Sequence, residues 1–515
     1  MIQERRASGE GSSIASPGPI ATAESFGPTD RRRGWIVTAV IGALAAITRL
    51  TLLNYPTDAG TPVFDEKHYV IQAYQLLGNG WLEDNPGYGL VVHPPVGKQM
   101  IAIGELLLGY NAWGWRIIAA LSGVAIVVLV TRIVRRMTRS TLIGAIAGLL
   151  AVFESVLFIS SRMGMLDIFQ ALFVVGAFGC LIVDRDRVRE RMAAAAARGT
   201  IGLSDYGPRL GVRWWRFGAG VLLGLALGTK WSGLYYIAVF GLMSVAFDVA
   251  ARRAYGVRKP WKGTAIRDIG PALYALTGIP LVVYLLSYLP WFASETGVYR
   301  HVVGNQVPEG GFFGWVPDDL RALIYYSAQS LKFHEGLTNS AGNHHPWESK
   351  PFAWPMSLRP LLYYYVDSEN VSGCRTESCV KAILLVGVPA MWWLSLPMLA
   401  WLTWMAIVRR DWRYGTVLAA YGAGIVPWFA SLDRQMYFFY MVPAAPFMVM
   451  GFALVLASVL GPADASVERR RTGLLVVCLY LAVVIANFVW LWPILTGLPI
   501  STGMWQQELW LPSWR

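Results

Sequence analysis

Residues 113–136 read WGWRIIAALSGVAIVVLVTRIVRR, an apolar run that ends in a basic cluster. A helix needs about 20 apolar residues to cross the hydrocarbon core of a bilayer, so this run predicts a transmembrane helix. One cation, Arg116, lies about a turn from its beginning. A charge inside a span is costly and usually faces a partner or a cavity, which makes Arg116 a candidate functional residue.

The rest of the chain has the same character. Of its 515 residues 55% are hydrophobic and 15% are charged, whereas soluble domains carry roughly 25% charged residues. With 23 Trp residues and a mean hydropathy of +0.44, the composition predicts an all-α multi-pass membrane protein. We expect about eleven transmembrane helices, at residues 35–53, 113–134, 141–160, 164–183, 215–230, 232–250, 270–292, 381–408, 414–431, 437–460 and 472–495.

Two regions follow from this division. Residues 1–34 are rich in Ser, Gly, Pro and Ala and lack the apolar core of a signal peptide, which predicts a disordered cytoplasmic tail. Residues 35–515 form the predicted polytopic membrane domain, with long loops at 54–112 and 293–380.

Arginine and lysine set the expected orientation. Dense basic clusters occupy alternate connections of the predicted spans, namely those near Arg31–Arg33, Arg135, Arg191, Arg258, Arg410 and Arg470. Because cytoplasmic loops are enriched in Lys and Arg, this side is predicted to be cytoplasmic, with the amino terminus inside and the carboxyl terminus outside. The bias explains the formal net charge of +12 without any nucleic-acid partner.

Chemically suggestive residues gather on the predicted external side. The loop at 54–112 contains FDEKHY (64–69), with Asp65 and Glu66, and HPPVGK (93–98), with His93 and Lys98. Arg162, Asp167, Lys230 and Arg434 lie in or beside other external connections, Glu154 lies in the third span, and the loop at 293–380 contains HPWESKPFAWP (345–355). Their convergence on one face predicts an external active site.

Ordinary structural roles compete with this interpretation. Asp65 and Glu66 are also compatible with a solvated loop, Lys98 with a contact to lipid phosphate, and Lys230 with an interfacial anchor. Arg162 and Asp167 are also compatible with a pair across a short turn that Glu154 joins.

The cysteines and histidines add little chemistry. Cys374 and Cys379 lie in an external loop, where a small disulfide is plausible. Adjacent side chains such as His344 and His345 point apart, so no metal site is predicted, and the need for a divalent metal stays open.

An outward-facing membrane site suggests a lipid-linked sugar donor, since its anionic head can be held by the cations Lys98, Arg116, Arg162, Lys230 and Arg434. The acceptor hydroxyl needs a base, and Asp65 suits that role because a carboxylate beside lipid has a raised pKa. Trp347 and Trp354 are candidates to stack on a sugar or a peptide.

At these motifs the sequence resembles the dolichyl-phosphate-mannose–protein mannosyltransferases, bacterial branch, of the membrane glycosyltransferase C superfamily. The resemblance rests on FDEKHY, HPPVGK, ESVLFISSRMGMLDIF (154–169), GTKWSGLY (228–235) and HPWESKPFAWP, with DRQMYFFYMVPAAPF (433–447) further on. It covers nearly the whole chain from residue 35.

The resemblance implies transfer of mannose from a polyprenyl-phosphate-mannose donor to Ser or Thr of exported proteins, with inversion. It implies that Asp65 is the base, that Glu66 positions the substrate or a loop, and that Arg116 binds the donor phosphate. His93, Lys98, Arg162, Asp167 and Lys230 would be supporting groups. We also expect the segment with His345, Trp347, Lys350 and Trp354 to close over the donor and shape the acceptor groove.

The large loop sets this chain apart from eukaryotic members of the family, which carry a β-trefoil domain there. Residues 293–380 are too few to hold one. The expected location is the cell membrane, with acceptor proteins met during export through the secretion machinery. Two alternatives stay open: a related transferase acting on lipid or glycan, and a transporter, although the charges lie at one rim and no repeated halves are visible.

Overall fold

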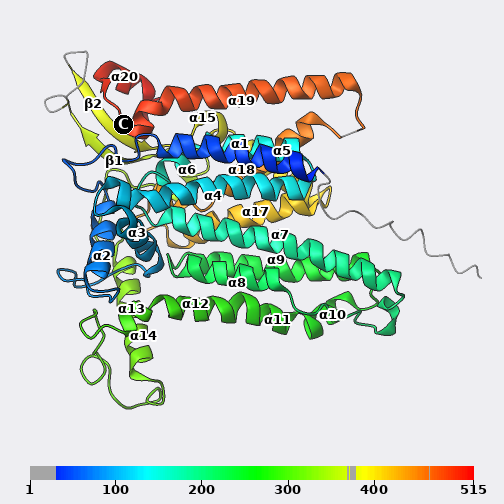
Figure 1. Ribbon diagram of the computed structural model, residues 1–515, viewed down its shortest axis with the longest axis horizontal. Coiled ribbons are helices and arrows are strands. Elements are labelled where there is room, and N and C mark those ends of the chain that lie inside the picture. Colours follow the sequence, from blue (N-terminus) through cyan, green and yellow to red (C-terminus); the bar gives the residue numbers. More distant parts are fainter. Residues whose placement is uncertain (1–29, 368–370, 372–377, 463) are drawn as a thin grey trace, which may run out of the picture.

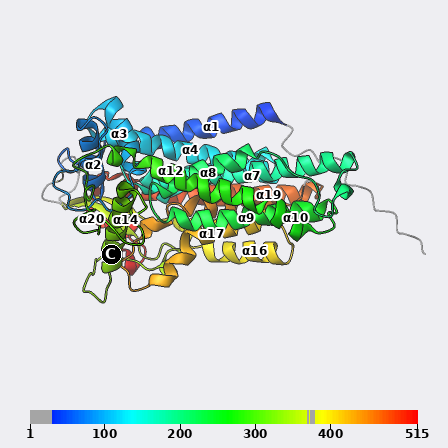
Figure 2. The ribbon, with the colours of Figure 1, turned by 90° about the horizontal axis from the view of Figure 1, so that it is seen from below.

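The computed structural model describes residues 30–367, 371, 378–462 and 464–515. Long helices lie side by side along its longest axis, and shorter elements gather at one end of this bundle (Figures 1 and 2). The mostly helical fold predicted from the apolar runs is confirmed. Residues 1–29 of the expected tail and Cys374 of the suggested disulfide lie outside the described residues.

Seven helical stretches among the described residues are long and apolar enough to cross a membrane. They are α1 (Arg31–Leu50), α4 (Ala112–Thr138), α7 (Asp167–Ala197), α9 (Gly233–Ala254), the stretch Ile269–Ser287, the stretch Pro389–Ile407 and α19 (Val467–Thr496). The fifth combines α11 (Ile269–Leu273), a π-helical turn (Tyr274–Gly278) and α12 (Ile279–Ser287), and the sixth combines α15 (Pro389–Trp392) and α16 (Ser395–Ile407).

Four of the eleven predicted spans fall on shorter apolar helices. These are α5 (Thr141–Val152), α8 (Trp214–Leu227), α17 (Trp412–Ile425) and α18 (Ala445–Leu460). At a rise of about 1.5 Å per residue, 12 to 16 residues extend only about 18–24 Å, less than the roughly 30 Å hydrocarbon core. The shorter helices therefore leave the exact number of full spans a prediction.

A buried carboxylate divides the third predicted span. Glu154 is the residue before α6 (Ser155–Ser160), and its side chain accepts hydrogen bonds from the backbone N–H groups of Val156 and Leu157. Its Oε1 also accepts a hydrogen bond from Trp392 at 2.8 Å. Because these bonds satisfy the free donors at the start of α6, they favour a new helix here and end α5 early.

The remaining short elements lie together at one end of the bundle. They are α2 (Glu66–Gly78), α3 (Val96–Leu108), α13 (Leu289–Phe292), α14 (Asp318–Gly336) and α20 (Thr502–Glu508), with 3₁₀ turns at Pro351–Ala353, Val426–Ser431, Phe438–Met441 and Pro512–Trp514. Figure 1 shows α14 running across the direction of the long helices and projecting beyond them. The described part of the 293–380 loop contains α14, the turn Pro351–Ala353, the strand Leu361–Val366 and the first two residues of the strand Cys379–Leu385.

A small antiparallel sheet lies at the same end, which the all-helical prediction did not include. Its order is β1 (Leu361–Val366), β2 (Cys379–Leu385) and β3 (Ile500–Ser501). The predicted span 381–408 is therefore wrong at its beginning, since its first residues belong to β2 and the helix begins only at Pro389. Apolar composition could not separate a buried strand from a span, and Pro389 suits the first turn of a helix.

The basic connections lie at the opposite end of the bundle. They join α4 to α5, α7 to α8, α9 to α11 through α10 (Pro260–Arg267), α16 to α17, and α18 to α19. A 3₁₀ turn, Ile201–Leu203, lies in the second of these connections. The sequence placed these basic clusters together on one side, and the fold separates them from the cluster of short elements (Figure 1).

Candidate active site

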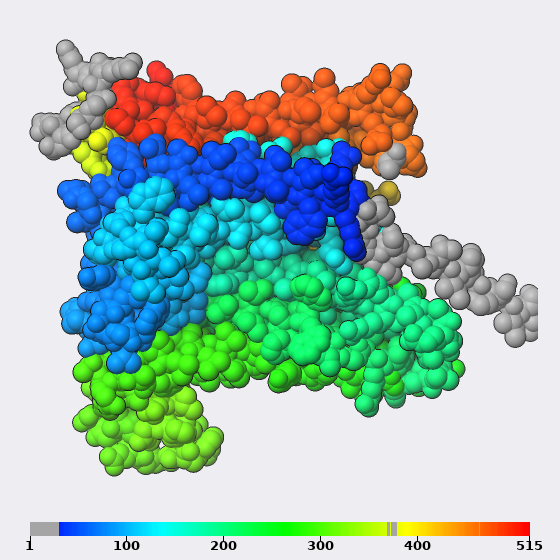
Figure 3. Space-filling view, in the orientation of Figure 1, coloured from blue at the N-terminus to red at the C-terminus, as the bar shows by residue number. Residues whose placement is uncertain are grey.

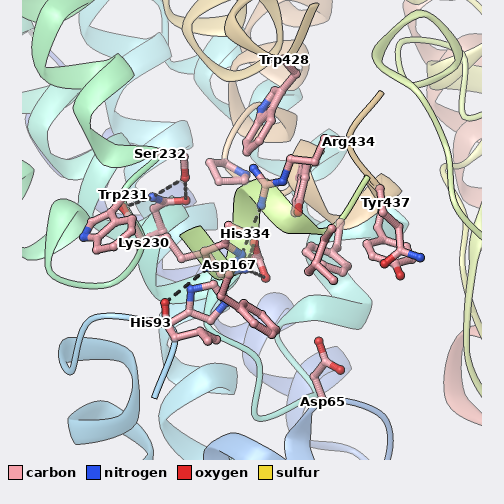
Figure 4. A pocket seen from close by; sticks show the side chains of 18 of the residues that line it. Asp65, His93, Asp167, Lys230, Trp231, Ser232, His334, Trp428, Arg434 and Tyr437 are labelled. Atoms are coloured by element: carbon pink, nitrogen blue, oxygen red, sulfur yellow. Dashed lines mark hydrogen bonds and ion pairs between the residues drawn. The ribbon is translucent and has the colours of Figure 1, made fainter. Parts of the chain in front are cut away.

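A cavity of about 840 Å³ lies where the short elements meet the ends of the long helices. Its walls come from five parts of the chain: the start of α2, the segment before α3, the start of α7, residues 230–236, and the region from α14 to Tyr440. Figure 4 shows Asp65, Lys230 and Arg434 facing this shared space. With Asp167, the cavity therefore brings two carboxylates and two cations together from distant parts of the sequence.

Asp65 stands at the beginning of α2 and lines the cavity. The preceding residue, Phe64, has a φ of 51°, a left-handed conformation that is strained for a bulky side chain. The Phe64 ring stacks on Tyr363 of β1 at 4.6 Å between centroids, which helps to hold this turn. Burial raises the pKa of Asp65, and Lys230 and His68 oppose that rise.

The Asp65 carboxylate accepts no hydrogen bond from any described residue. It is half-buried and faces the cavity instead. A carboxylate with free lone pairs and a raised pKa is suited to accept a proton from a bound hydroxyl.

Lys230 and Asp167 form an ion pair inside the cavity. Lys230 Nζ lies 2.8 Å from both carboxylate oxygens of Asp167, and the side chains are 10% and 3% exposed. Gln170 donates to the backbone oxygen of Lys230 and to Ser232 Oγ, both at 3.0 Å, and so holds the 230–232 turn. The positive charge of Lys230 is therefore already balanced within the protein.

Arg434 is a less balanced cation. Within the described part of the chain no carboxylate lies within 4 Å of its guanidinium, and its buried Nε has no hydrogen-bond partner. The guanidinium lies over Trp428 at 5.5 Å and over Tyr440 at 5.9 Å. Such a guanidinium is available for an anionic ligand.

Two histidines lie near Arg434: His334 contacts its guanidinium, and His93 lies beside His334. His334 of α14 has Nδ1 3.4 Å from Arg434 Nη2 and Nε2 3.4 Å from the oxygen of Val92, so the geometry fits an Nε2–H tautomer. Burial lowers the pKa of His334 to about 4, with a further contribution from Arg434. Burial also lowers the pKa of His93, whose ring lies 5.3 Å from that of His334. Both rings are therefore neutral near pH 7.

Glu66 and Arg116, two predicted site residues, lie outside the cavity wall and form a fully buried pair. Arg116 Nε and Nη2 donate to the two Glu66 oxygens at 2.8 Å, and Nη1 donates to the backbone oxygens of Leu53 and Pro56. The structure does not bring Arg116 to the cavity as the predicted phosphate ligand, because its donors are used internally. Glu66 also accepts from the backbone of Gly164 at 2.6 Å, which fits the predicted positioning role.

Three more predicted site residues serve the framework. Arg162 donates to the backbone oxygens at the end of α1, among them Thr51, and burial lowers its pKa to about 9. Glu154 caps α6, away from the cavity. Lys98 forms an ion pair with Glu83, with 3.7 Å between Lys98 Nζ and Glu83 Oε1. None of the three lines the cavity.

The HPWESKPFAWP segment divides between cavity and framework. His345 lines the cavity, with its ring 5.3 Å from that of Tyr437. Trp347 lies under the guanidinium of Arg359 at 4.8 Å, and Trp354 is fully buried with its Nε1 bonded to Ser349. Lys350 Nζ donates to Asn339 Oδ1 at 2.5 Å and to the backbone oxygen of Arg434 at 2.9 Å. Trp347 and Trp354 do not line the cavity. Lys350 does not line it either, but it holds the backbone of Arg434, which does.

Sequence reasoning missed several lining residues. They are His334, Tyr69, Gln170, Trp231, Ser232, Trp428, Tyr437 and Tyr440. His334 lies in a helix with no motif around it, so no local pattern indicated it. Tyr437 and Tyr440 belong to DRQMYFFY, a segment that carries the resemblance, but no pattern in it singles out either ring as a neighbour of Arg434.

Comparison with known proteins identifies the family. A family model described as dolichyl-phosphate-mannose-protein mannosyltransferase matches residues 39–294, and one described as the C-terminal four TMM region of protein-O-mannosyltransferase matches residues 320–514. The chain is 59% identical over 502 residues to a polyprenol-phosphate-mannose–protein mannosyltransferase of Mycobacterium tuberculosis, covering 98% of this chain and 96% of the relative. It is 43% identical over 484 residues to a protein of the same name from Corynebacterium glutamicum, covering 93% of each.

A solved structure agrees with these sequence relationships. The Saccharomyces cerevisiae protein O-mannosyltransferase Pmt1-Pmt2 complex bound to the sugar donor matches with a TM-score of 0.70 at 14% identity, covering 94% of this chain and 93% of that chain. At that identity the match shows a common fold. The family models and the two relatives show that this chain belongs to the dolichyl-phosphate-mannose–protein mannosyltransferase family.

Proposed function

We propose that this chain transfers a mannosyl group from polyprenyl-phosphate-mannose to Ser or Thr hydroxyls of protein acceptors. The names of its relatives at 59% and 43% identity support the donor and the protein acceptor. The observation that carries the proposal is the cavity in which Asp65 meets Lys230 and Arg434 at the end of a membrane bundle. A base and two cations at the end of a membrane bundle suit a donor whose anionic head is attached to a lipid.

In the proposed reaction the acceptor oxygen attacks the anomeric carbon of mannose from the face opposite the phosphate. A bond forms between this oxygen and the anomeric carbon, the bond from that carbon to the phosphate oxygen breaks, and polyprenyl phosphate leaves. The hydroxyl proton passes to Asp65. Its raised pKa supports this role, because a base whose pKa approaches the working pH accepts a proton more readily.

Arg434 is the proposed ligand of the donor phosphate. Its guanidinium has no carboxylate partner in the described part of the chain, and two bonds from a planar fork suit a phosphate diester. Lys230, paired with Asp167, is placed to orient the sugar or to share the charge of the leaving group. This assignment replaces Arg116, which is committed to Glu66.

The proposed orientation puts the cavity on the external side of the cell membrane. The arginine-rich connections lie at the other end of the bundle, and such connections are usually cytoplasmic. Under this orientation the acceptors are exported polypeptides, met as they leave the secretion machinery.

The test supplies membranes that contain the chain with radiolabelled polyprenyl-phosphate-mannose and a Ser/Thr-rich peptide. We expect label in the peptide, with a product of anomeric configuration opposite to that of the donor, as NMR would show. A peptide in which each Ser and Thr is replaced by Ala is the matched control. Label that appears in lipid or glycan instead of the peptide would contradict a protein acceptor.

A further inference from the structure

A second cavity, of about 470 Å³, lies at the end of the bundle opposite the active site. Its wall comes from the connection between α7 and α8, from the first turn of α8, and from the junction of α10 with α11. The charged residues in this wall are Arg209, Arg213, Arg216, Arg267 and Asp268. Four guanidinium groups thus face one lining carboxylate.

The inner part of this wall is a closed ionic network. Arg213 binds Asp248 at 2.7 Å and also binds Asp184, while Arg216 binds Asp248. Asp268 forms an ion pair with Arg252, with 2.7 Å between Asp268 Oδ2 and Arg252 Nη2. The three carboxylates of the network are therefore already satisfied by arginines other than Arg209 and Arg267.

The two outer arginines, Arg209 and Arg267, have no acidic partner among the described residues. Arg267 donates to neutral oxygens, those of Gly207 and Ser204, and Arg209 is exposed with no carboxylate within 4 Å among the described residues. Five guanidinium groups, with Arg252 included, thus meet three carboxylates and leave two positive charges uncompensated.

The inner arginines belong to the network more than to the cavity. Arg216 is 1% exposed, and its enclosed Nε, which has no hydrogen-bond partner among the described residues, lies 3.8 Å from a carboxylate oxygen of Asp184. An anion in the cavity would therefore be held by the outer arginines, Arg209 and Arg267.

Exposed apolar side chains occur in the lining of the cavity and in the segments next to it, which suits a lipid. Ile266 lines it and is 64% exposed, and Trp214 at the start of α8 is 72% exposed. Leu273, one turn into the adjoining apolar stretch, is 59% exposed. Exposed Trp and aliphatic side chains beside a basic recess at the end of spans fit a headgroup with its acyl chains alongside.

We propose that this cavity binds the phosphate group of an anionic membrane lipid. Inorganic phosphate shares the recognised chemistry, but it makes no use of the exposed apolar side chains. The site lies at the far end of the bundle from Asp65, so it is separate from the donor cavity.

The test titrates the purified full chain, in neutral detergent, with phosphatidylglycerol, phosphatidylcholine or inorganic phosphate, and follows lipid retention by native mass spectrometry. We expect saturable retention of phosphatidylglycerol and none of comparable affinity for phosphatidylcholine or inorganic phosphate. Arg209→Glu should weaken phosphatidylglycerol binding about tenfold, because it reverses one of the two uncompensated charges.

Arg209→Glu is expected to fold normally, since Arg209 is exposed and forms no hydrogen bond or ion pair with any described residue. Arg409→Glu, an exposed arginine in the connection between α16 and α17, is the matched control and should bind phosphatidylglycerol as the unmodified chain does. Equal affinity for both lipids, or an Arg209→Glu variant indistinguishable from the control, would overturn the proposal. Inorganic phosphate that binds as tightly as phosphatidylglycerol would overturn the lipid assignment.

Discussion

The residues next to Asp65 in the chain determine that its side chain faces the cavity. Phe64 takes a left-handed conformation with φ 51° and is held by its stack on Tyr363, so the chain turns sharply before α2 begins. Glu66, the next residue, points to the opposite side and is fully buried against Arg116. Two adjacent carboxylates thus receive different environments and different roles.

The variant Asp65→Asn should lose transfer activity by about 10²–10⁴-fold, because the amide cannot accept the hydroxyl proton. Initial rates per mole of folded protein, with lipid donor and peptide acceptor, measure this. Asp58→Asn, at an exposed carboxylate of the same loop, is the control and should keep its rate. Comparable rates in the two variants would remove Asp65 from the role of base.

The pH dependence should report the same carboxylate. Asp65 acts as a base only when deprotonated, and burial raises its pKa above the ordinary value of about 3.9. Activity should therefore fall as the pH drops through a value higher than 3.9. A profile of kcat/KM against pH tests this, and an acid limb at or below pH 3.9 would contradict it.

At the scale of elements, the Glu66–Arg116 pair fastens α2 to α4 and to the turn at Gly164. Arg116→Met should lower the free energy of unfolding by about 3–5 kcal/mol, because it leaves a buried carboxylate unpaired. The double change Glu66→Leu with Arg116→Met should lose less, since it removes both charges. Thermal unfolding in detergent would compare them, and a raised donor KM with unchanged stability would instead support a phosphate role for Arg116.

The segment 337–350 holds the connection that carries Arg434. Asn339 N–H donates to the backbone oxygen of Asp433, Gln435 N–H donates to that of Leu337, and Lys350 Nζ donates to that of Arg434. All three hydrogen bonds end on backbone oxygens. They therefore position Arg434 without neutralising the charge of its guanidinium.

Lys350→Met should raise the donor KM several-fold at normal protein yield, because Arg434 loses one of its backbone restraints while the side-chain length is kept. Lys332→Met, at an exposed lysine of α14, is the matched control. Donor and acceptor titrations per mole of folded protein separate the outcomes. Reduced yield with unchanged kinetics would mean that Lys350 only anchors the loop.

At the scale of the whole molecule, the charges are divided between two ends. The donor cavity lies at one end and the arginine-rich connections at the other, which is the distribution that fixes orientation during insertion. The long helices of Figure 1 separate the two ends, and Figure 3 shows the outer surface of that body.

Single cysteines at Asn305 and Arg409 should therefore differ in intact cells. We expect an impermeant thiol reagent to modify Asn305→Cys and to modify Arg409→Cys only after permeabilisation. Asn305 belongs to the connection between α13 and α14 and Arg409 to that between α16 and α17, and these connections lie at opposite ends of the bundle. A chain free of its four native cysteines is the background. Modification of Arg409→Cys in intact cells would reverse the proposed orientation.

The sequence by itself determined the membrane character, the order of the helices and the face on which the motifs gather. These follow from local quantities: a run of about 20 apolar residues must be shielded from water, and arginines at its ends bias the side on which they stay. It also indicated Asp65, His93, Lys230 and Arg434, which line one cavity.

Only the tertiary structure decided which charges pair. Glu66 and Arg116 are 50 residues apart, and Asp167 and Lys230 are 63 apart, so no local pattern links them. Within the part of the chain that the structure describes, the pairing leaves Arg434, and not Arg116, without a carboxylate. The fold also brings His334 beside Arg434 from a helix that carried no motif. The physical reason is that a buried charge is governed by whichever partner the fold brings within a few ångströms, and the spacing of residues along the chain does not contain that distance.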